Sequence, residues 1–142
     1  MNREILFRAK TEGNRKWVKG LLNYCSDNGS ITKLETYAPH SSGVYTIDPG
    51  TTCQYIGSTD KNDTKIFEGD IVRGKMHCYY GYKMCVGVVV YYDNAFKVNI
   101  DPDGFMGDYK NIPPDCEVIG NIFDDNIYQL RECVKRGIQK DD

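Results

Sequence analysis

The sequence predicts a mainly β protein, and three observations support that prediction. The chain has eleven Tyr and five Phe among its 142 residues, and aromatic and β-branched residues favour strands. It also contains 14 Gly, and glycine favours turns. Its apolar runs are short and separated by turn-forming residues, most clearly at residues 84–100, where Asp93-Asn94 divides two such runs as in a β-hairpin.

Residues 1–50 are expected to form an N-terminal hairpin region. Two apolar-alternating runs flank the turn dipeptide Gly13-Asn14, which predicts an antiparallel hairpin. Two weaker strand candidates follow, separated by loops rich in Ser, Gly and Pro. The predicted strands of this region are residues 2–9, 16–22, 31–37 and 44–47.

Residues 51–123 are expected to form the core of the fold. Asp63 lies in a polar hairpin tip where a left-handed residue is needed, and Asp tolerates that conformation better than a branched residue does. Gly69-Asp70 interrupts two apolar stretches, which predicts a corner or a bulge. The predicted strands are residues 53–56, 66–67, 71–73, 84–92, 95–100 and 116–123.

The end of the chain has a helical pattern, at residues 124–137. Ile127, Leu130 and Val134 share one face of the expected helix, Asp124-Asp125 is expected to cap its start, and Gly137 is expected to end it. Residues 138–142 are expected to be frayed.

These elements predict one domain over residues 1–142. Short strands, corner glycines and one long hairpin are typical of a small, partly closed barrel of SH3-like type. The barrel would carry the N-terminal hairpin as an extension and end in the short helix.

Composition argues against several classes of protein. The net charge of −2 gives the whole chain no general attraction to nucleic acid or anionic lipid. No run approaches the roughly 18 apolar residues of a membrane span, and the first residues lack the apolar region of a signal peptide. We therefore expect a cytoplasmic protein without membrane contact, whose six cysteines are reduced thiols.

No motif indicates catalysis, a cofactor or a metal. The two histidines, His40 and His77, lie far apart in sequence, and His40 precedes two serines on a loop with nothing to position them. The six-residue gap between Cys78 and Cys85 is wider than a zinc knuckle requires. Asp60-x-Asn62-x-Thr64 lacks the glycine and the glutamate of a calcium loop. We therefore expect a protein that is not an enzyme and has no cofactor.

Charge is unevenly distributed along the chain. Residues 1–20 hold six Lys or Arg against two Glu, and residues 93–125 hold eight acids against two Lys. One interpretation is a nucleic-acid surface on the N-terminal hairpin, in which cations contact phosphates and aromatic side chains such as Trp17 and Phe7 stack on bases. Its candidate residues are Arg3, Arg8, Arg15 and Lys16.

Two other interpretations of the charge pattern remain open. The cations of the hairpin can simply point outward while Trp17 and Phe7 pack into a core. Alternatively, the basic end of one subunit meets the acidic part of another, which would make the protein a homo-oligomer.

Seven segments stand in a fixed order along the chain: Arg3–Ala9, Gly50–Gly57, Asp60–Asn62, Ile66–Val72, Gly87–Asp93, Ala95–Phe96 and Glu117–Phe123. Together they resemble the YopX family of proteins carried by bacteriophages and prophages. They span nearly the whole chain, and the central one, from Asp60 to Val72, is the most specific. In the family the position of Asp63 usually holds Gly, and that of Ile56 often holds Thr.

The resemblance implies a mainly β, SH3-like barrel of phage origin, and it brings no established activity and no catalytic residue. Taken together, these observations predict a phage- or prophage-associated, non-catalytic interaction or assembly module that acts as a homo-oligomer. Its partners would be further copies of itself or an unknown host or phage protein, and nucleic-acid binding is the alternative.

Overall fold

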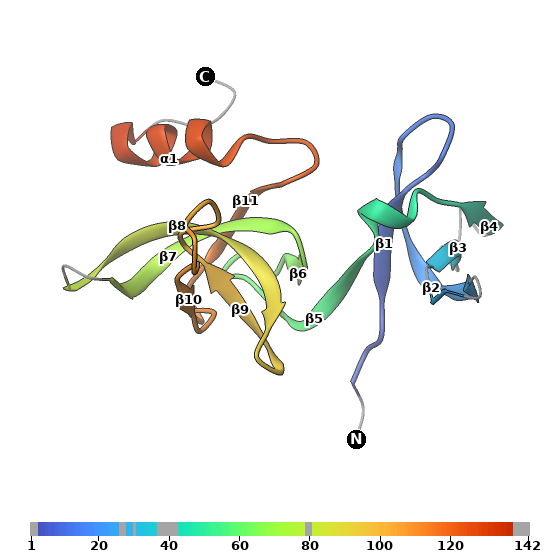
Figure 1. Cartoon of the computed structure of the whole chain (residues 1–142), viewed down its shortest axis with the longest axis horizontal. Helices are drawn as coiled ribbons and strands as arrows, with labels where there is room; N and C mark the ends of the chain where they lie inside the picture. The colour runs from blue at the N-terminus through green and yellow to red at the C-terminus, as the bar shows by residue number, and fades with distance from the viewer. Residues whose placement is uncertain (1–2, 26–27, 30, 37–42, 79–80, 138–142) are drawn as a thin grey trace. The chain divides into compact units, whose positions relative to one another are not determined.

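The computed structural model describes residues 3–25, 28–29, 31–36, 43–78 and 81–137 (Figure 1). The chain divides into two compact units, Met1–Gly57 and Ser58–Asp142. The predicted division at residue 50 therefore falls shortly before the boundary between them. Within the described chain, no helix is long and apolar enough to cross a membrane.

Eleven strands, one 3-10 helix and one α-helix follow one another along the described chain. They are β1 (Phe7–Lys10), β2 (Trp17–Cys25), β3 (Ile31–Thr36), β4 (Gly43–Thr46), η1 (Pro49–Thr51), β5 (Cys53–Thr59), β6 (Lys65–Phe67), β7 (Asp70–Cys78), β8 (Gly81–Tyr92), β9 (Ala95–Asn99), β10 (Tyr109–Lys110), β11 (Glu117–Asn121) and α1 (Ile127–Arg136).

The first unit is built on an antiparallel sheet. Its strands lie in the order β4-β3-β2-β1-β5, and β5 continues beyond Gly57 to pair with β6. The predicted N-terminal hairpin is confirmed, since β1 and β2 pair antiparallel around the turn that contains Gly13. Ala9, Leu34 and Ile47 form the buried core, against which Phe7 and Val18 pack. The core thus takes the alternate side chains of β1 and β2.

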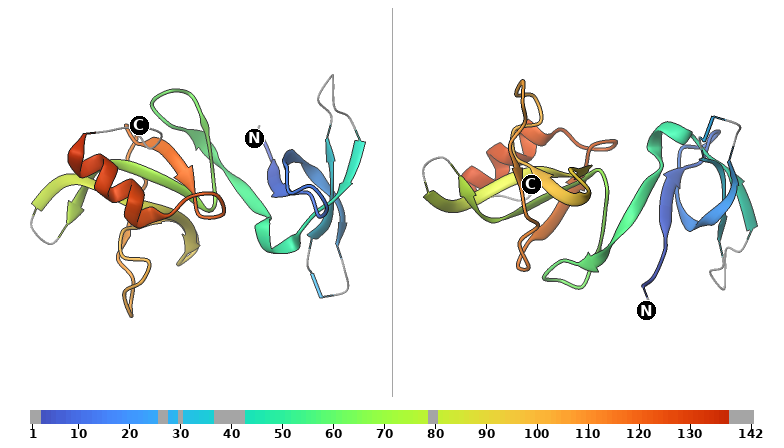
Figure 2. Two further views of the ribbon diagram at one scale, coloured as in Figure 1. Left: turned by 90° about the horizontal axis from the view of Figure 1, so that it is seen from above. Right: turned by 60° about the horizontal axis from the view of Figure 1, so that its bottom comes forward.

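The second unit has a five-stranded antiparallel sheet in the order β10-β9-β8-β7-β11. Helix α1 lies across one face of this sheet, as Figure 2 shows. Leu130 is buried there against Ile71, Val86 and Val88, with Ile127 and Val134 packed beside it. The predicted apolar face of the helix is therefore confirmed.

The corner at Gly69-Asp70 has the expected conformation. Gly69 has φ of 82°, in the left-handed region that favours glycine. Its N–H donates to the carbonyl of Val89 at 2.8 Å, and its own carbonyl accepts from Ile122 N–H at 2.9 Å. Gly69 thereby connects β8 and the end of β11 at the point where the chain enters β7.

Two predicted turns also use left-handed residues. Asp63 has φ of 63°, and Asp93 and Asn94 have φ of 52° and 64°. Two consecutive positive φ values define the type I′ turn of a two-residue hairpin, here between β8 and β9. These polar residues therefore meet the conformational demand that glycine usually meets.

The structure confirms a mainly β fold with one helix, leaves the SH3-like barrel unconfirmed and corrects the predicted helix cap. No closed barrel is found among the described strands, which form the two sheets given above. The helix is capped by Asn126, whose side chain accepts from Tyr128 N–H, and not by Asp124-Asp125. Asp125 instead accepts from the N–H of Asn121 at 3.1 Å, so its carboxylate is used before the helix begins.

Candidate functional site

The first unit presents a cationic surface on β1 and β2. The strand register pairs Arg8 with Lys19 and Lys10 with Trp17. Side chains of directly opposed residues point to the same face of a sheet, and alternate residues of a strand do so too. These four residues therefore share the face opposite Ala9 and Val18, and we call them the basic face.

Trp17 is the centre of the basic face. The guanidinium carbon of Arg8 lies 4.8 Å from the Trp17 ring centroid, and Lys10 Nζ lies 5.4 Å from it. Such cation–π contacts contribute about 0.5–1 kcal/mol each at exposed sites. The expectation that Trp17 packs into the core is therefore wrong, because its register position puts it beside the cations, whereas Phe7 does pack inward as expected.

The structure brings only one of the four predicted nucleic-acid residues into the basic face. Arg8 belongs to it, while Arg3 and Lys16 are exposed outside β1 and β2. Arg15 lies in the turn with φ of 57°, and its guanidinium pairs with Asp48 at 2.6 Å. The hydrogen bond from Arg15, followed by that from Gly50 N–H, lowers the pKa of Asp48.

Sequence reasoning named Trp17 as a stacking ring of this surface but missed Lys10 and Lys19, which share its face. The signal was present, because pairing the two strands around Gly13-Asn14 places alternate residues on one face. Counting charges identifies residues 1–20 as basic but does not show which side chains lie on the same face of the sheet.

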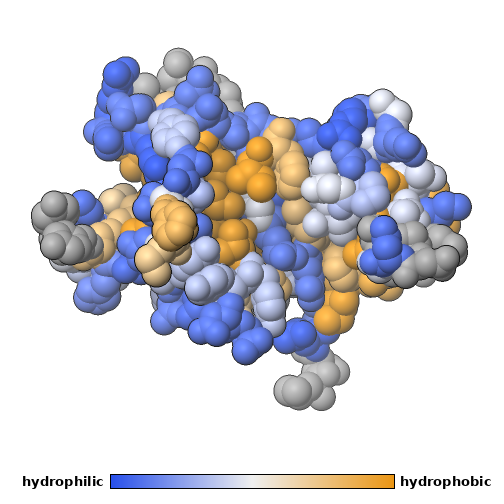
Figure 3. Space-filling view, in the orientation of Figure 1, coloured by the Kyte–Doolittle hydropathy of each residue, from blue (hydrophilic) through white to orange (hydrophobic). Residues whose placement is uncertain are grey.

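The second unit carries a different exposed surface between β9 and β10, which we call the acidic loop (residues 101–107). Asn99 Oδ1 accepts from the N–H groups of Asp101 and Asp108, both at 3.0 Å, and so holds the two ends together. Phe105 is 104% exposed and Met106 80% exposed. Hydrophobic side chains, orange in Figure 3, reach the surface among hydrophilic ones.

The histidines and the aspartate that could have served catalysis or metal binding do not form such a site among the described residues. His40 is outside the described residues, and the exposed His77 ring lies 4.8 Å from that of Tyr82. Asp60 is 6% exposed. Its carboxylate accepts from the N–H groups of Asn62, Thr64 and Val118, each at 2.9 Å.

Asp60 therefore anchors its turn to β11, at a residue 58 positions further along the chain. Burial raises the pKa of Asp60, but the three hydrogen bonds and the charge of Lys61 outweigh it, so that the pKa is lowered. The Asp-x-Asn-x-Thr spacing thus marks a backbone anchor. In the part of the chain that the structure describes, no group of three or more His, Cys, Asp or Glu side chains is arranged to hold a metal ion.

One pair of cysteines departs from the expectation of reduced thiols, while three others are free thiols. Cys78 and Cys85, on the paired strands β7 and β8, form a disulfide. The hairpin brings their sulfur atoms together although its register pairs Cys78 with Gly81 and Gly74 with Cys85. Cys53 and Cys116 are buried thiols, and Cys133 is partly exposed. Burial, followed by the charges of Asp60 and Asp115, raises the pKa of the Cys116 thiol.

The amino-acid sequence of this two-sheet β protein has a match among known families. The family model described as YopX protein matches residues 6–127, which is most of the chain. The chain therefore belongs to the YopX family. No curated protein matches it.

Proposed function

We propose that the protein is a non-catalytic interaction module that self-associates, with the acidic loop of one copy against the basic face of another. The observation that carries the proposal is the exposure of Phe105 and Met106 beside Asp101 and Asp103. Contiguous exposed apolar side chains are typical of a contact surface, and these two are neighbours in sequence. Burying each of them would contribute about 1.5–3 kcal/mol.

Charge complementarity selects the other half of the contact. The basic face contributes Arg8, Lys10 and Lys19 together with an aromatic ring. An acidic, apolar loop and a cationic, aromatic face match in both charge and hydrophobicity. If each loop meets the face of the other copy, the contact closes a two-fold dimer; a single loop–face contact is head-to-tail and closes into a ring or extends according to the rotation between copies.

Sedimentation velocity over a range of concentrations and ionic strengths tests this proposal. We expect an average mass above that of the monomer at low salt, which falls as salt screens the charges. The double variant Phe105→Ser with Met106→Ser and the variant Asp103→Lys are expected to be monomeric. Val44→Ser, which changes an exposed apolar side chain on β4, is the matched control and should associate as the wild type does. A strict monomer under every condition would overturn the proposal.

Nucleic-acid binding on the basic face is the second candidate. It is favoured by one specific observation, the position of Trp17 between cations on a sheet face. A base can stack on such a ring while the cations contact the phosphates. Trp17 is the only tryptophan of the chain, so its fluorescence reports on this face alone.

Labelled single-stranded and double-stranded DNA and RNA, titrated in a salt series, test the second candidate. Lys10→Glu with Lys19→Glu should abolish binding and its salt dependence. Arg15→Ala should have a smaller effect, because Arg15 is already paired with Asp48. Asp103→Lys separates the two functions, since it should prevent self-association and leave nucleic-acid binding intact. Absence of binding at low salt would remove this candidate.

A further inference from the structure

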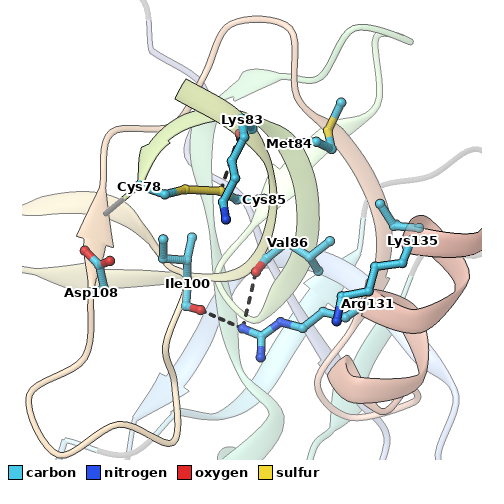
Figure 4. A pocket seen from close by; sticks show the side chains of 10 residues that line it. Cys78, Lys83, Met84, Cys85, Val86, Ile100, Asp108, Arg131 and Lys135 are labelled. Carbon is cyan, nitrogen blue, oxygen red and sulfur yellow. Dashed lines mark hydrogen bonds between the residues drawn. A yellow bond between two sulfur atoms is a disulfide. The ribbon is translucent and has the colours of Figure 1, made fainter. Parts of the chain in front are cut away.

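The second unit contains a cavity of about 340 Å³ whose lining includes no residue of the acidic loop. It lies between β8, the segment that follows β9, and helix α1 (Figure 4). Its apolar lining includes Val86, Ile100 and Val134, and the Cys78–Cys85 disulfide forms part of its wall. A volume of this size accommodates a few side chains or a small ligand.

The edge of strand β8 faces this cavity. Residues 83–86 line it consecutively, whereas side chains on one face of a strand would contribute alternate residues. Strand β9 pairs with β8 only over Val88–Tyr92. Among the described residues, no strand continues the sheet beside Met84 on that side.

The register shows which backbone groups point toward the cavity. Tyr92 and Ala95 flank the two-residue turn and form a hydrogen-bonded pair, so Val90 and Val88 also bond to β9. Continuing this alternation along β8 directs the N–H and C=O groups of Val86 and Met84 away from β7, toward the side on which β9 lies further along the strand. The residues between them, such as Cys85, bond to β7 instead.

Arg131 already makes the first contact along this edge. Its guanidinium donates to the carbonyl of Val86 at 3.4 Å and to that of Ile100 at 2.6 Å. A side chain of α1 thus occupies the place where the N–H of a further strand would bond, immediately beyond the end of β9. The backbone of Met84 comes next along the edge.

The charge around the cavity is opposite to that of the whole chain. Lys83, Arg131 and Lys135 line it with a single acid, Asp108. Asp108 pairs with Lys110 at 3.1 Å, and Lys135 pairs with Glu132 at 3.3 Å on the exposed side of the helix. The chain as a whole has a net charge of −2. The cavity is therefore a locally cationic, apolar groove beside an open strand edge.

We propose that this edge binds an extended, acidic peptide segment of another protein, which adds to the sheet as a strand beside Met84 and Val86. The backbone of the segment would bond to the edge, its carboxylates would lie near Lys83 and Lys135, and an apolar side chain would enter the cavity. Binding by strand addition takes affinity from the main chain and specificity from alternate side chains. A second copy of β8 is a poorer occupant, because its Lys83 would meet cations.

A fluorescein-labelled synthetic peptide that alternates Val and Glu tests this proposal by anisotropy, with the full-length protein carrying Phe105→Ser and Met106→Ser to remove self-association. We expect this peptide to bind and one that alternates Val and Lys not to bind. A Val/Glu peptide N-methylated at alternate residues should bind at least about tenfold more weakly, because it lacks the donors of a strand. Peptide binding should also slow hydrogen exchange at the amides of Met84 and Val86.

Two variants complete the test. Met84→Pro removes an edge N–H without removing a bond to β7, and proline is tolerated on edges; it should weaken peptide binding while Met84→Leu does not. Lys83→Glu should also weaken binding. Failure of the Val/Glu peptide to bind, or equal binding of the N-methylated or Lys-containing peptide, would overturn strand addition. Neither result bears on self-association, which is measured on the wild type.

Discussion

The buried carboxylate of Asp70 accepts a 2.8 Å hydrogen bond from the backbone N–H of Phe67. Phe67 ends β6 and Asp70 begins β7, so this bond closes the corner in which Gly69 is left-handed. Asp70 is 1% exposed, and its carboxylate is therefore a structural acceptor and no solvent-facing site.

Replacing Gly69 by Val should destabilise the protein by about 2 kcal/mol or more, because a β-branched residue is strained at positive φ. Urea unfolding measures this loss. Gly13→Val is the matched control, since a side chain at Gly13 meets no atom within 4 Å and its φ is not positive. A Gly69→Val variant as stable as the control would show that the corner tolerates any residue.

Asp70→Ala should cost roughly 1–3 kcal/mol, because the buried N–H of Phe67 would lose its acceptor. The melting temperature should fall while self-association measured well below it stays intact. Wild-type stability combined with loss of a partner would mean that Gly69-Asp70 is a binding site and not a corner.

Asp60 should make stability depend on pH. Its folded-state pKa is lowered below the ordinary value of 3.8, so its stabilising effect is complete well above that value and is lost as the pH falls through the lowered pKa. Asp60→Asn keeps the size of the side chain, but the amide NH₂ group then faces one of the three backbone N–H groups that the carboxylate accepts from. Two donors cannot bond to each other, so that hydrogen bond is lost. The difference in unfolding free energy between wild type and variant should therefore be large near neutral pH and shrink below about pH 4. A difference that does not change with pH would contradict this role.

The start of helix α1 allows the roles of Asn126 and Asp124 to be compared. Asn126→Ala should destabilise the protein by about 1 kcal/mol, the usual cost of a lost N-cap. Asp124→Ala should cost less, because its bond to Asn121 Nδ2 is exposed. Thermal unfolding of both variants measures the order, and the reverse order would support the cap predicted from sequence.

Alkylation followed by mass spectrometry tests the state of the cysteines. In the folded protein without reductant, Cys133 should react, whereas Cys53 and Cys116 should react only after unfolding because they are buried. Cys78 and Cys85 should react only after reduction. Rapid labelling of both without reductant would show a dithiol in solution.

Local features of the fold were predictable from sequence, and longer-range ones were not. The turns at Gly69, Asp63 and Asp93-Asn94 could be predicted, because the tolerance of positive φ depends on the type of residue. The helix face followed from periodicity. The helix cap was misassigned because the Asp125 carboxylate accepts from the N–H of Asn121. The sequence does not show which backbone N–H a carboxylate will accept from. Barrel closure was likewise beyond reach, since it depends on which strands pair, and short strands do not specify their neighbours.

The same distinction applies to the candidate sites. Charge counting found the basic region, but the register of β1 and β2 selected Lys10, Lys19 and Trp17 from it. No sequence pattern marked the cavity beside β8, because Arg131 on α1 and Met84 on β8 come together only through the packing of the helix on the sheet.

The bond between Asp60 and Val118 has a consequence for the order of folding. It joins residues 58 positions apart, and closing so long a loop is entropically unfavourable until neighbouring strands have formed. The β7–β8–β9 hairpins, whose contacts are local, should therefore form first, and the Asp60 anchor should form after the folding transition state. Asp60→Asn is then expected to accelerate unfolding in stopped-flow experiments while the refolding rate stays nearly that of the wild type. A slowed refolding limb would instead place this anchor in the folding nucleus.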